Sequence, residues 1–124
     1  MQPENFRPPG FSVEQESLAD APGVRVSGEV DLSTAPQLTA VLERMIPTTQ
    51  GPLVVDLCDV EFVGSSAISV LLRIRAVLGR EDRQMLVVCP QGPIRRTFDT
   101  AGVGDVFLFF ESREQAAAAL KPVG

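Results

Sequence analysis

The stretch VVDLCDVEFVGSSAI, residues 54–68, says most about the fold and function of this chain. An apolar strand runs into a short acidic turn, and a small Gly64-Ser65-Ser66 step then precedes an apolar helix. The first backbone N–H groups of a helix have no partner within it, so they donate to hydroxyl caps and attract phosphate groups. Ser65 and Ser66 are therefore candidates for a helix cap and for a phosphorylation switch, and the local sequence favours the cap because caps are common.

The composition favours one acidic, globular domain. The chain has 124 residues, of which 44% are hydrophobic and 22% are charged, a normal balance for a protein with a single core. Its net charge of -5 argues against nucleic-acid binding, which needs a surplus of basic residues. No apolar run has the length of a membrane span and no leader resembles a signal peptide, so we expect a cytoplasmic protein without a membrane partner.

The sequence lacks the residue types that most enzymes need. The absence of histidine removes the commonest general base and the usual nucleophile pairs. The 2 cysteines cannot build a structural zinc site alone, and no Gly-rich phosphate loop occurs in the sequence. We therefore expect a binding module without cofactor or metal, and a small enzyme or nucleotide hydrolase is the alternative from another class.

Strand and helix patterns alternate after an opening hairpin. Turn residues at 20–23 separate two alternating segments, which predicts an antiparallel pair. Ser33 is placed to cap the first helix, and Ser112–Gln115 reads as a capping box for the last one. The expected strands are 11–17, 24–30, 53–57, 85–89 and 106–110, and the expected helices are 35–46, 66–78, 94–100 and 113–120. This order predicts an α/β fold in one domain at 11–120, with a flexible N-terminal tail at 1–10 and a C-terminal tail at 121–124.

Three segments in this order resemble the STAS domain family, and in particular the bacterial anti-sigma factor antagonists. They are GEVDLSTA at 28–35, the run from VVDL to FVGSSA at 54–67, and the run from LVVCP through IRRTF to AG at 86–102. The resemblance covers about residues 11–120. It implies the STAS fold, a mixed, mostly parallel β-sheet with an N-terminal antiparallel hairpin and about four helices packed on it.

The resemblance also implies a mechanism. The switch loop of the family usually reads Asp-Ser-[Ser/Thr]-Gly, and the serine after the Asp is phosphorylated by a partner anti-sigma factor that is itself a serine kinase. Unphosphorylated antagonist binds that kinase and frees a sigma factor, whereas phosphorylated antagonist releases it. Carried over to this sequence, the acceptor is Ser65, with Ser66 as the second candidate. The implied partners are the anti-sigma factor and a phosphatase, and the chain is expected to be a monomer or a weak dimer.

The expected partner-binding surface joins the switch loop to the turn before the first helix. Asp31 is expected mainly to brace that turn. Gly64 stands where the family usually has Asp, and Ala67 where it usually has Gly, which keeps a second reading open: a STAS scaffold subunit that docks, unphosphorylated, in a larger signalling or transport assembly. The expected partner-binding residues are Asp31, Ser33, Thr34, Gly64, Ser65, Ser66, Ser69 and Arg73.

Cys58 and Cys89 fall at the ends of two strands that are expected to be neighbours, so a disulfide is geometrically conceivable. In a cytoplasmic protein we expect two reduced, partly buried thiols, and a redox switch is the lesser alternative. Asp56 and Asp59 are interpreted as turn and solvent residues, because no base or metal ligand accompanies them as a catalytic pair would require.

Overall fold

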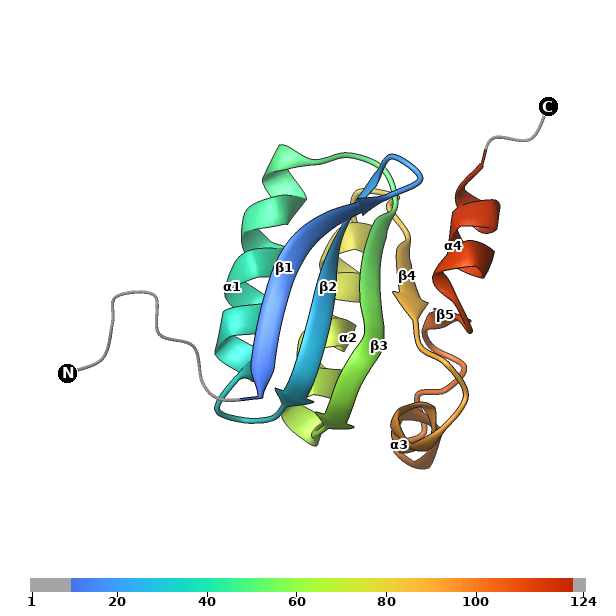
Figure 1. Ribbon diagram of the computed structural model, residues 1–124. Helices are drawn as coiled ribbons and strands as arrows, with labels where there is room; N and C mark the ends of the chain where they lie inside the picture. Colours follow the sequence, from blue (N-terminus) through green and yellow to red (C-terminus); the bar gives the residue numbers. More distant parts are fainter. Residues whose placement is uncertain (1–9, 122–124) are drawn as a thin grey trace.

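The computed structural model describes residues 10–121, which form a five-stranded sheet in the order β1-β2-β3-β4-β5 with helices packed on it (Figure 1). β1 and β2 are antiparallel and the other pairs are parallel, which confirms the predicted mixed, mostly parallel sheet with its opening hairpin. The strands are β1 (Phe11–Leu18), β2 (Ala21–Val30), β3 (Leu53–Val63), β4 (Met85–Val88) and β5 (Leu108–Phe110). The helices are α1 (Ala35–Met45), the short 3-10 turn η1 (Ile46–Thr48), α2 (Ser65–Gly79), α3 (Pro93–Thr100) and α4 (Arg113–Leu120). Apart from Gly10 and Lys121, the expected tails at 1–10 and 121–124 lie outside the described residues.

The hairpin turn is shorter than the sequence predicts. Ala19 and Asp20 alone form it, with φ values of 48 and 68 degrees, and Ala21 already pairs with Leu18. A two-residue hairpin loop needs positive φ at both positions to match the twist of the strands. The predicted turn at 20–23 is therefore wrong, because residues 21–23 belong to β2.

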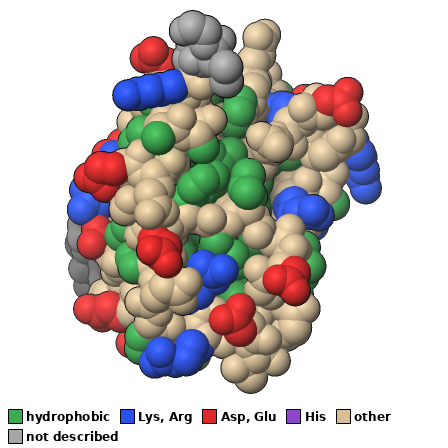
Figure 2. All heavy atoms as spheres, turned by 90° about the vertical axis from the view of Figure 1, so that its right-hand side faces the viewer, with side chains coloured by type: hydrophobic (Ala, Val, Ile, Leu, Met, Phe, Trp, Pro, Cys, Tyr) green, Lys and Arg blue, Asp and Glu red, His purple; other side chains and the backbone are tan. Residues whose placement is uncertain are grey.

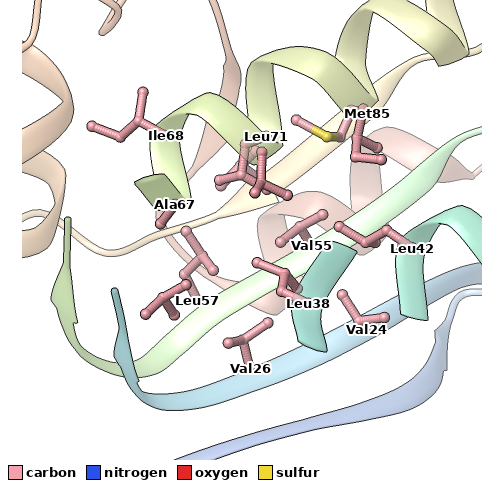
Figure 3. Close-up of a cluster of buried hydrophobic side chains, with 14 of the residues drawn as sticks. Val24, Val26, Leu38, Leu42, Val55, Leu57, Ala67, Ile68, Leu71 and Met85 are labelled. Carbon is pink, nitrogen blue, oxygen red and sulfur yellow. The ribbon is translucent and has the colours of Figure 1, made fainter. Parts of the chain in front are cut away.

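Helices cover the two faces of the sheet unequally. α1 and α2 pack on one face, where β2, β3, β4 and both helices supply the main hydrophobic cluster, including Val26, Leu42 and Leu71 (Figure 3). α4 packs on the opposite face through a small cluster around Val54, Leu86 and Ala116. Figure 2 views the molecule from the side that carries α4 and β5, and hydrophobic side chains remain visible between the charged ones. Among residues 10–121, no helix has the length and apolar character needed to cross a membrane.

β3 continues to Val63, so the predicted strand end at Leu57 and the acidic turn after it are wrong. The register against β2 slips twice, since β3 advances from Asp56 to Asp59 and later from Val60 to Phe62 with an extra residue each time. Such bulges allow consecutive residues of one strand to point away from the core. The residues that stay buried recur every third position, at Leu57, Val60 and Val63. The pairs between them, 58–59 and 61–62, are exposed.

Asp56 is not the solvent-facing turn residue that the sequence predicts. It is only 4% exposed, and its Oδ2 accepts a hydrogen bond of 2.7 Å from Nη1 of Arg113. The other guanidinium nitrogen of Arg113 lies 2.8 Å from Oε1 of Glu16, so one side chain of α4 joins β3 to β1. These two carboxylates raise the pKa of Arg113, and Glu16 has the larger effect.

The predicted cap of α4 is confirmed, because the hydroxyl of Ser112 accepts a hydrogen bond from the backbone N–H of Gln115 at 3.1 Å.

Candidate partner-binding site

The predicted site residues come together at the carboxyl ends of β2 and β3. The N–H of Gly64 donates to the carbonyl of Val30 over 2.9 Å, which joins the end of β3 directly to the end of β2. The turn that begins at Asp31 leads into α1, and the Gly64-Ser65 step leads into α2. Because neighbouring parallel strands end at the same edge of a sheet, the two loops lie side by side.

Asp31 braces the turn before α1, as the sequence predicts. Its Oδ1 accepts hydrogen bonds from the N–H and the hydroxyl of Ser33, at 2.9 and 2.7 Å, and from the N–H of Thr34. These bonds, led by that from the Ser33 hydroxyl, lower the pKa of Asp31, so the carboxylate is charged at neutral pH.

The predicted cap at Ser33 is wrong, since α1 begins after Thr34. Thr34 also differs from its predicted role in partner binding. It is 3% exposed, and its hydroxyl donates to the carbonyl of Glu29 while accepting from the N–H of Asp31. Thr34 therefore holds the turn together from inside and offers a partner no side-chain surface.

Ser65 is the first residue of α2 and is exposed, whereas Ser66 is half-buried and lines a groove. The N-cap position belongs to Gly64, so the prediction that either serine caps the helix is wrong. In the described part of the chain, no hydrogen bond engages the Ser65 hydroxyl. The greater exposure of Ser65 favours it over Ser66 as an acceptor for a modifying enzyme.

The backbone does not require glycine at position 64. Gly64 has a φ of -92 degrees, and a Cβ placed there would lie 3.4 Å from Cε2 of Phe62 and 3.7 Å from the carbonyl oxygen of Val30, which are ordinary contacts. An aspartate, as in the usual family pattern, would fit.

Gly28, in contrast, is required by the backbone. Its φ is +83 degrees, and a Cβ there would lie 1.4 Å from the carbonyl oxygen of Gly10.

A groove runs between α1 and α2 next to the two serines. Its volume is about 650 Å³, and its polar lining includes the predicted partner residues Ser66, Ser69 and Arg73. Nη2 of Arg73 lies 3.4 Å from Oε1 of Glu43, so an exposed ion pair bridges the two helices. The residues that line the groove are Leu32, Ala35, Pro36, Thr39, Ala40, Glu43, Ser66, Ser69, Val70 and Arg73.

The loops and strand ends that form this site carry no basic residue. Neither segment 26–43 nor segment 54–72 contains lysine or arginine. The nearest basic residue on β2, Arg25, is bound to Asp59 at 2.6 Å, which raises the pKa of Arg25. The acidic residues in the two segments are Glu29, Asp31, Glu43, Asp56, Asp59 and Glu61. A phosphate on Ser65 would therefore increase the negative charge of an acidic surface.

Two exposed apolar side chains flank the site, and the sequence analysis missed both. Leu32, in the Asp31 turn, is 82% exposed, and Phe62, two residues before Gly64, is 50% exposed. Large apolar side chains this exposed often mark contact surfaces. The signal in the sequence was the three-residue spacing of the buried positions in β3, which directs Phe62 outward.

The two cysteines lie in different environments. Cys89 is buried in the main cluster with Leu57, whereas Cys58 is exposed. Their strands β3 and β4 are neighbours, as the sequence predicts, and both thiols are free. Partial desolvation of the sulfur and the nearby Asp56 carboxylate raise the pKa of Cys58 to about 12, and burial raises that of Cys89 to about 11. Residues 10–121 also contain no group of three or more acidic, cysteine or histidine side chains that could hold a metal ion.

Several known proteins that are similar to this chain are anti-sigma factor antagonists. The anti-sigma-F factor antagonist RsfB of Mycobacterium tuberculosis is 29% identical over 108 residues, which cover 85% of this chain and 88% of RsfB. A crystal structure of an anti-sigma factor antagonist from Mycobacterium paratuberculosis is 30% identical, with a TM-score of 0.82, covering 94% of this chain and 98% of that one. The anti-sigma factor antagonist SpoIIAA in its unphosphorylated form has a TM-score of 0.72 over 92% of this chain and 99% of its own, and at 18% identity it supports the fold alone.

The family assignment agrees with the fold and with these relatives. The model of the STAS domain matches residues 13–116, which include every strand and helix except parts of the first and last. The relatives are anti-sigma factor antagonists. This chain belongs to the STAS domain family.

Proposed function

We propose that this chain is an anti-sigma factor antagonist that is switched by phosphorylation at Ser65. Unmodified, it binds a serine-kinase-type anti-sigma factor and so releases a sigma factor. The kinase phosphorylates Ser65, the complex dissociates, and a phosphatase restores the unmodified form. The chain acts in the cytoplasm as a monomer or weak dimer.

The position of Ser65 is the observation that carries this proposal. It is the first residue of α2, its side chain is exposed, and the braced turn at Asp31 lies beside it. An acceptor at an exposed helix end can enter the active site of a kinase while the groove between α1 and α2 remains available to the rest of the partner. One relative in fold, SpoIIAA, has been solved in a phosphorylated as well as an unphosphorylated form.

The chemistry of the site explains how a phosphate could end binding without unfolding the chain. A phosphoserine carries about -1.5 to -2 charges at neutral pH. At the start of α2 the free backbone N–H groups of Ser65 and Ser66 stabilise that charge, so the helix persists. The partner, however, must now accommodate a bulky dianion where it had met a hydroxyl, and the strong hydration of that dianion opposes its burial in the contact.

The test is a pull-down from the lysate of the native host, with wild type, Ser65→Ala and Ser65→Asp as parallel baits, read by mass spectrometry. We expect wild type and Ser65→Ala to retain a kinase-type anti-sigma factor and Ser65→Asp to lose it. Ser17→Asp, on an exposed serine of β1 near the hairpin turn, is the matched charge control and should behave as wild type. Equal recovery of the anti-sigma factor on the Ser65→Asp bait would contradict the gating.

The second candidate function is that of an unphosphorylated scaffold in a larger signalling or transport assembly. The observation that favours it is Gly64, which leaves the loop without the aspartate usual in the family. Because a side chain fits at this position, Gly64→Asp separates the two functions. Phosphorylation of wild type at Ser65 by the host kinase supports the switch, whereas phosphorylation of Gly64→Asp alone supports the scaffold.

A further inference from the structure

Phe62 lies on the face of the sheet opposite to α1 and α2, and therefore opposite to the groove between these helices. Its neighbours Val63 and, on β2, Val30 are buried in the main core. Alternation along the strands therefore directs Phe62 and the residue that it pairs with, Glu29, to the opposite face. α4 packs on that face against β4, β5, the hairpin end of the sheet and residues 54–56 of β3. It does not extend over the ends of β2 and β3 (Figure 1), and α3 is the other helix that contacts β3 from beyond β4.

The second bulge of β3 exposes two consecutive side chains at this end of the strand. Because the strand carries an extra residue between Val60 and Phe62, Glu61 and Phe62 are exposed together. Glu29 is exposed directly opposite Phe62. We call Glu29, Glu61 and Phe62 the Phe62 patch: one half-exposed aromatic ring between two carboxylates, with no basic residue in either contributing segment.

We propose that the Phe62 patch is a second docking surface for the anti-sigma factor that binds at Ser65, and that the partner meets it with an apolar pocket rimmed by lysine or arginine. This inference rests on the proposed function. The patch is continuous with the Ser65 site, because only Val63 and Gly64 separate Phe62 from Ser65 along the chain. An interface of standard size covers about 800 Å² on each partner, which is more than the end of one helix offers.

The chemistry of the patch selects this occupant. Aromatic side chains are the commonest anchors of protein interfaces, and a ring surrounded by carboxylates is complementary to a pocket with a cationic rim. Gly64 increases access to the ring, since a Cβ at that position would lie 3.4 Å from Cε2 of Phe62. A side chain at position 64 would therefore contact the Cε2 edge of the ring, which glycine leaves uncovered.

The test measures how this chain and its variants bind to each serine-kinase-type anti-sigma factor of the same organism, purified and immobilised. The quantities measured are the dissociation constant and the association and dissociation rate constants. Phe62→Ala should weaken binding about tenfold, as expected for the loss of a buried aromatic anchor. Glu61→Lys should slow association severalfold at low salt, with a smaller effect as salt rises. Leu108→Ala, which truncates a 44% exposed apolar side chain on β5, and Glu81→Lys, beyond the far end of α2, are the matched controls and should stay within twofold of wild type.

Ser65→Asp in the same assay separates this inference from the proposed function. If wild type binds, Ser65→Asp loses binding and Phe62→Ala stays within twofold of wild type, the second docking surface is refuted and the switch stands. If Phe62→Ala weakens binding but Ser65→Asp does not, the patch stands and the gating is refuted. Failure of every anti-sigma factor to bind wild type refutes both. Circular dichroism and thermal melts matching wild type confirm that Phe62→Ala is folded.

Discussion

Replacing Arg113 by methionine would leave the carboxylate of Asp56 buried without its ion-pair partner. Asp56 is 4% exposed, and the remaining bond to its side chain in the described structure comes from the N–H of Cys58, at 2.9 Å. Removing one partner of a fully buried pair costs about 3–5 kcal/mol. Because the side chain of Arg113 is 33% exposed, water can reach the vacated site, and we expect the lower value of about 2–3 kcal/mol.

The magnitude converts to a melting temperature. At about 2.1 cal/mol/K for each residue, the entropy of unfolding near Tm is roughly 260 cal/mol/K for a chain of this length. A loss of about 2–3 kcal/mol therefore lowers Tm by roughly 8–12 °C. Calorimetry or a circular dichroism melt, together with a urea titration, measures both quantities.

The matched control is Arg25→Met, which removes an equally short but exposed ion pair with Asp59. Solvent screens such pairs, so this variant should melt close to wild type. In a double-mutant cycle, Asp56→Asn should cost much less in the Arg113→Met background than in wild type, because the two groups act as a pair. Additive effects, or equal small losses for Arg113→Met and Arg25→Met, would refute the structural role assigned to Asp56.

Three further predictions concern other parts of the chain. Gly28→Ala should destabilise the protein by at least about 2 kcal/mol, because φ is +83 degrees and a Cβ there would lie 1.4 Å from a carbonyl oxygen. The control Gly51→Ala, with φ +75 degrees and open space around the Cβ, should cost about 1 kcal/mol. Equal losses of unfolding free energy in urea titrations would contradict the close approach at Gly28. The pKa of Asp31 is lowered in the folded state, so its stabilising effect is present above the unfolded pKa of about 3.9 and is lost as pH falls through the folded value. The difference in Tm between wild type and Asp31→Asn should therefore shrink as the pH of the melt is lowered. A difference that stays constant with pH would argue against this role of the carboxylate. Iodoacetamide at pH 8 should alkylate Cys58 and Cys89 more slowly than free cysteine. Partial desolvation and the Asp56 carboxylate raise the pKa of Cys58 to about 12, and burial raises that of Cys89 to about 11. Reaction of the exposed Cys58 at the rate of free cysteine would show that its thiol is unperturbed.

The periodic elements could be predicted from the sequence, but the course of β3 could not. A regular strand alternates with period two, whereas the buried residues Leu57, Val60 and Val63 recur with period three because of two bulges. That spacing, with acidic residues between, is typical of a turn in a single sequence. Asp56 was misassigned for a related reason, since its ion-pair partner Arg113 lies on the last helix and no local pattern connects them.

The motif predicted where α2 begins, whereas the details of the loop before it depended on backbone geometry. The Gly64-Ser65 step predicted the start of α2, but which of these residues takes the N-cap position depends on where β3 ends. Thr34 was expected in the partner-binding surface from the family resemblance, yet it is buried, with its hydroxyl bonded to the carbonyl of Glu29 and the N–H of Asp31. Phe62 was overlooked because a phenylalanine in an apolar run is normally part of the core.

The most direct test of the central claim uses the chain with phosphoserine installed at position 65 and compares it with the unmodified chain. The dissociation constant of each form for the purified kinase-type anti-sigma factor is measured by calorimetry at one salt concentration. We predict that the phosphate weakens binding by about tenfold or more while the circular dichroism spectrum is unchanged. Equal dissociation constants for the two forms would contradict a switch at Ser65.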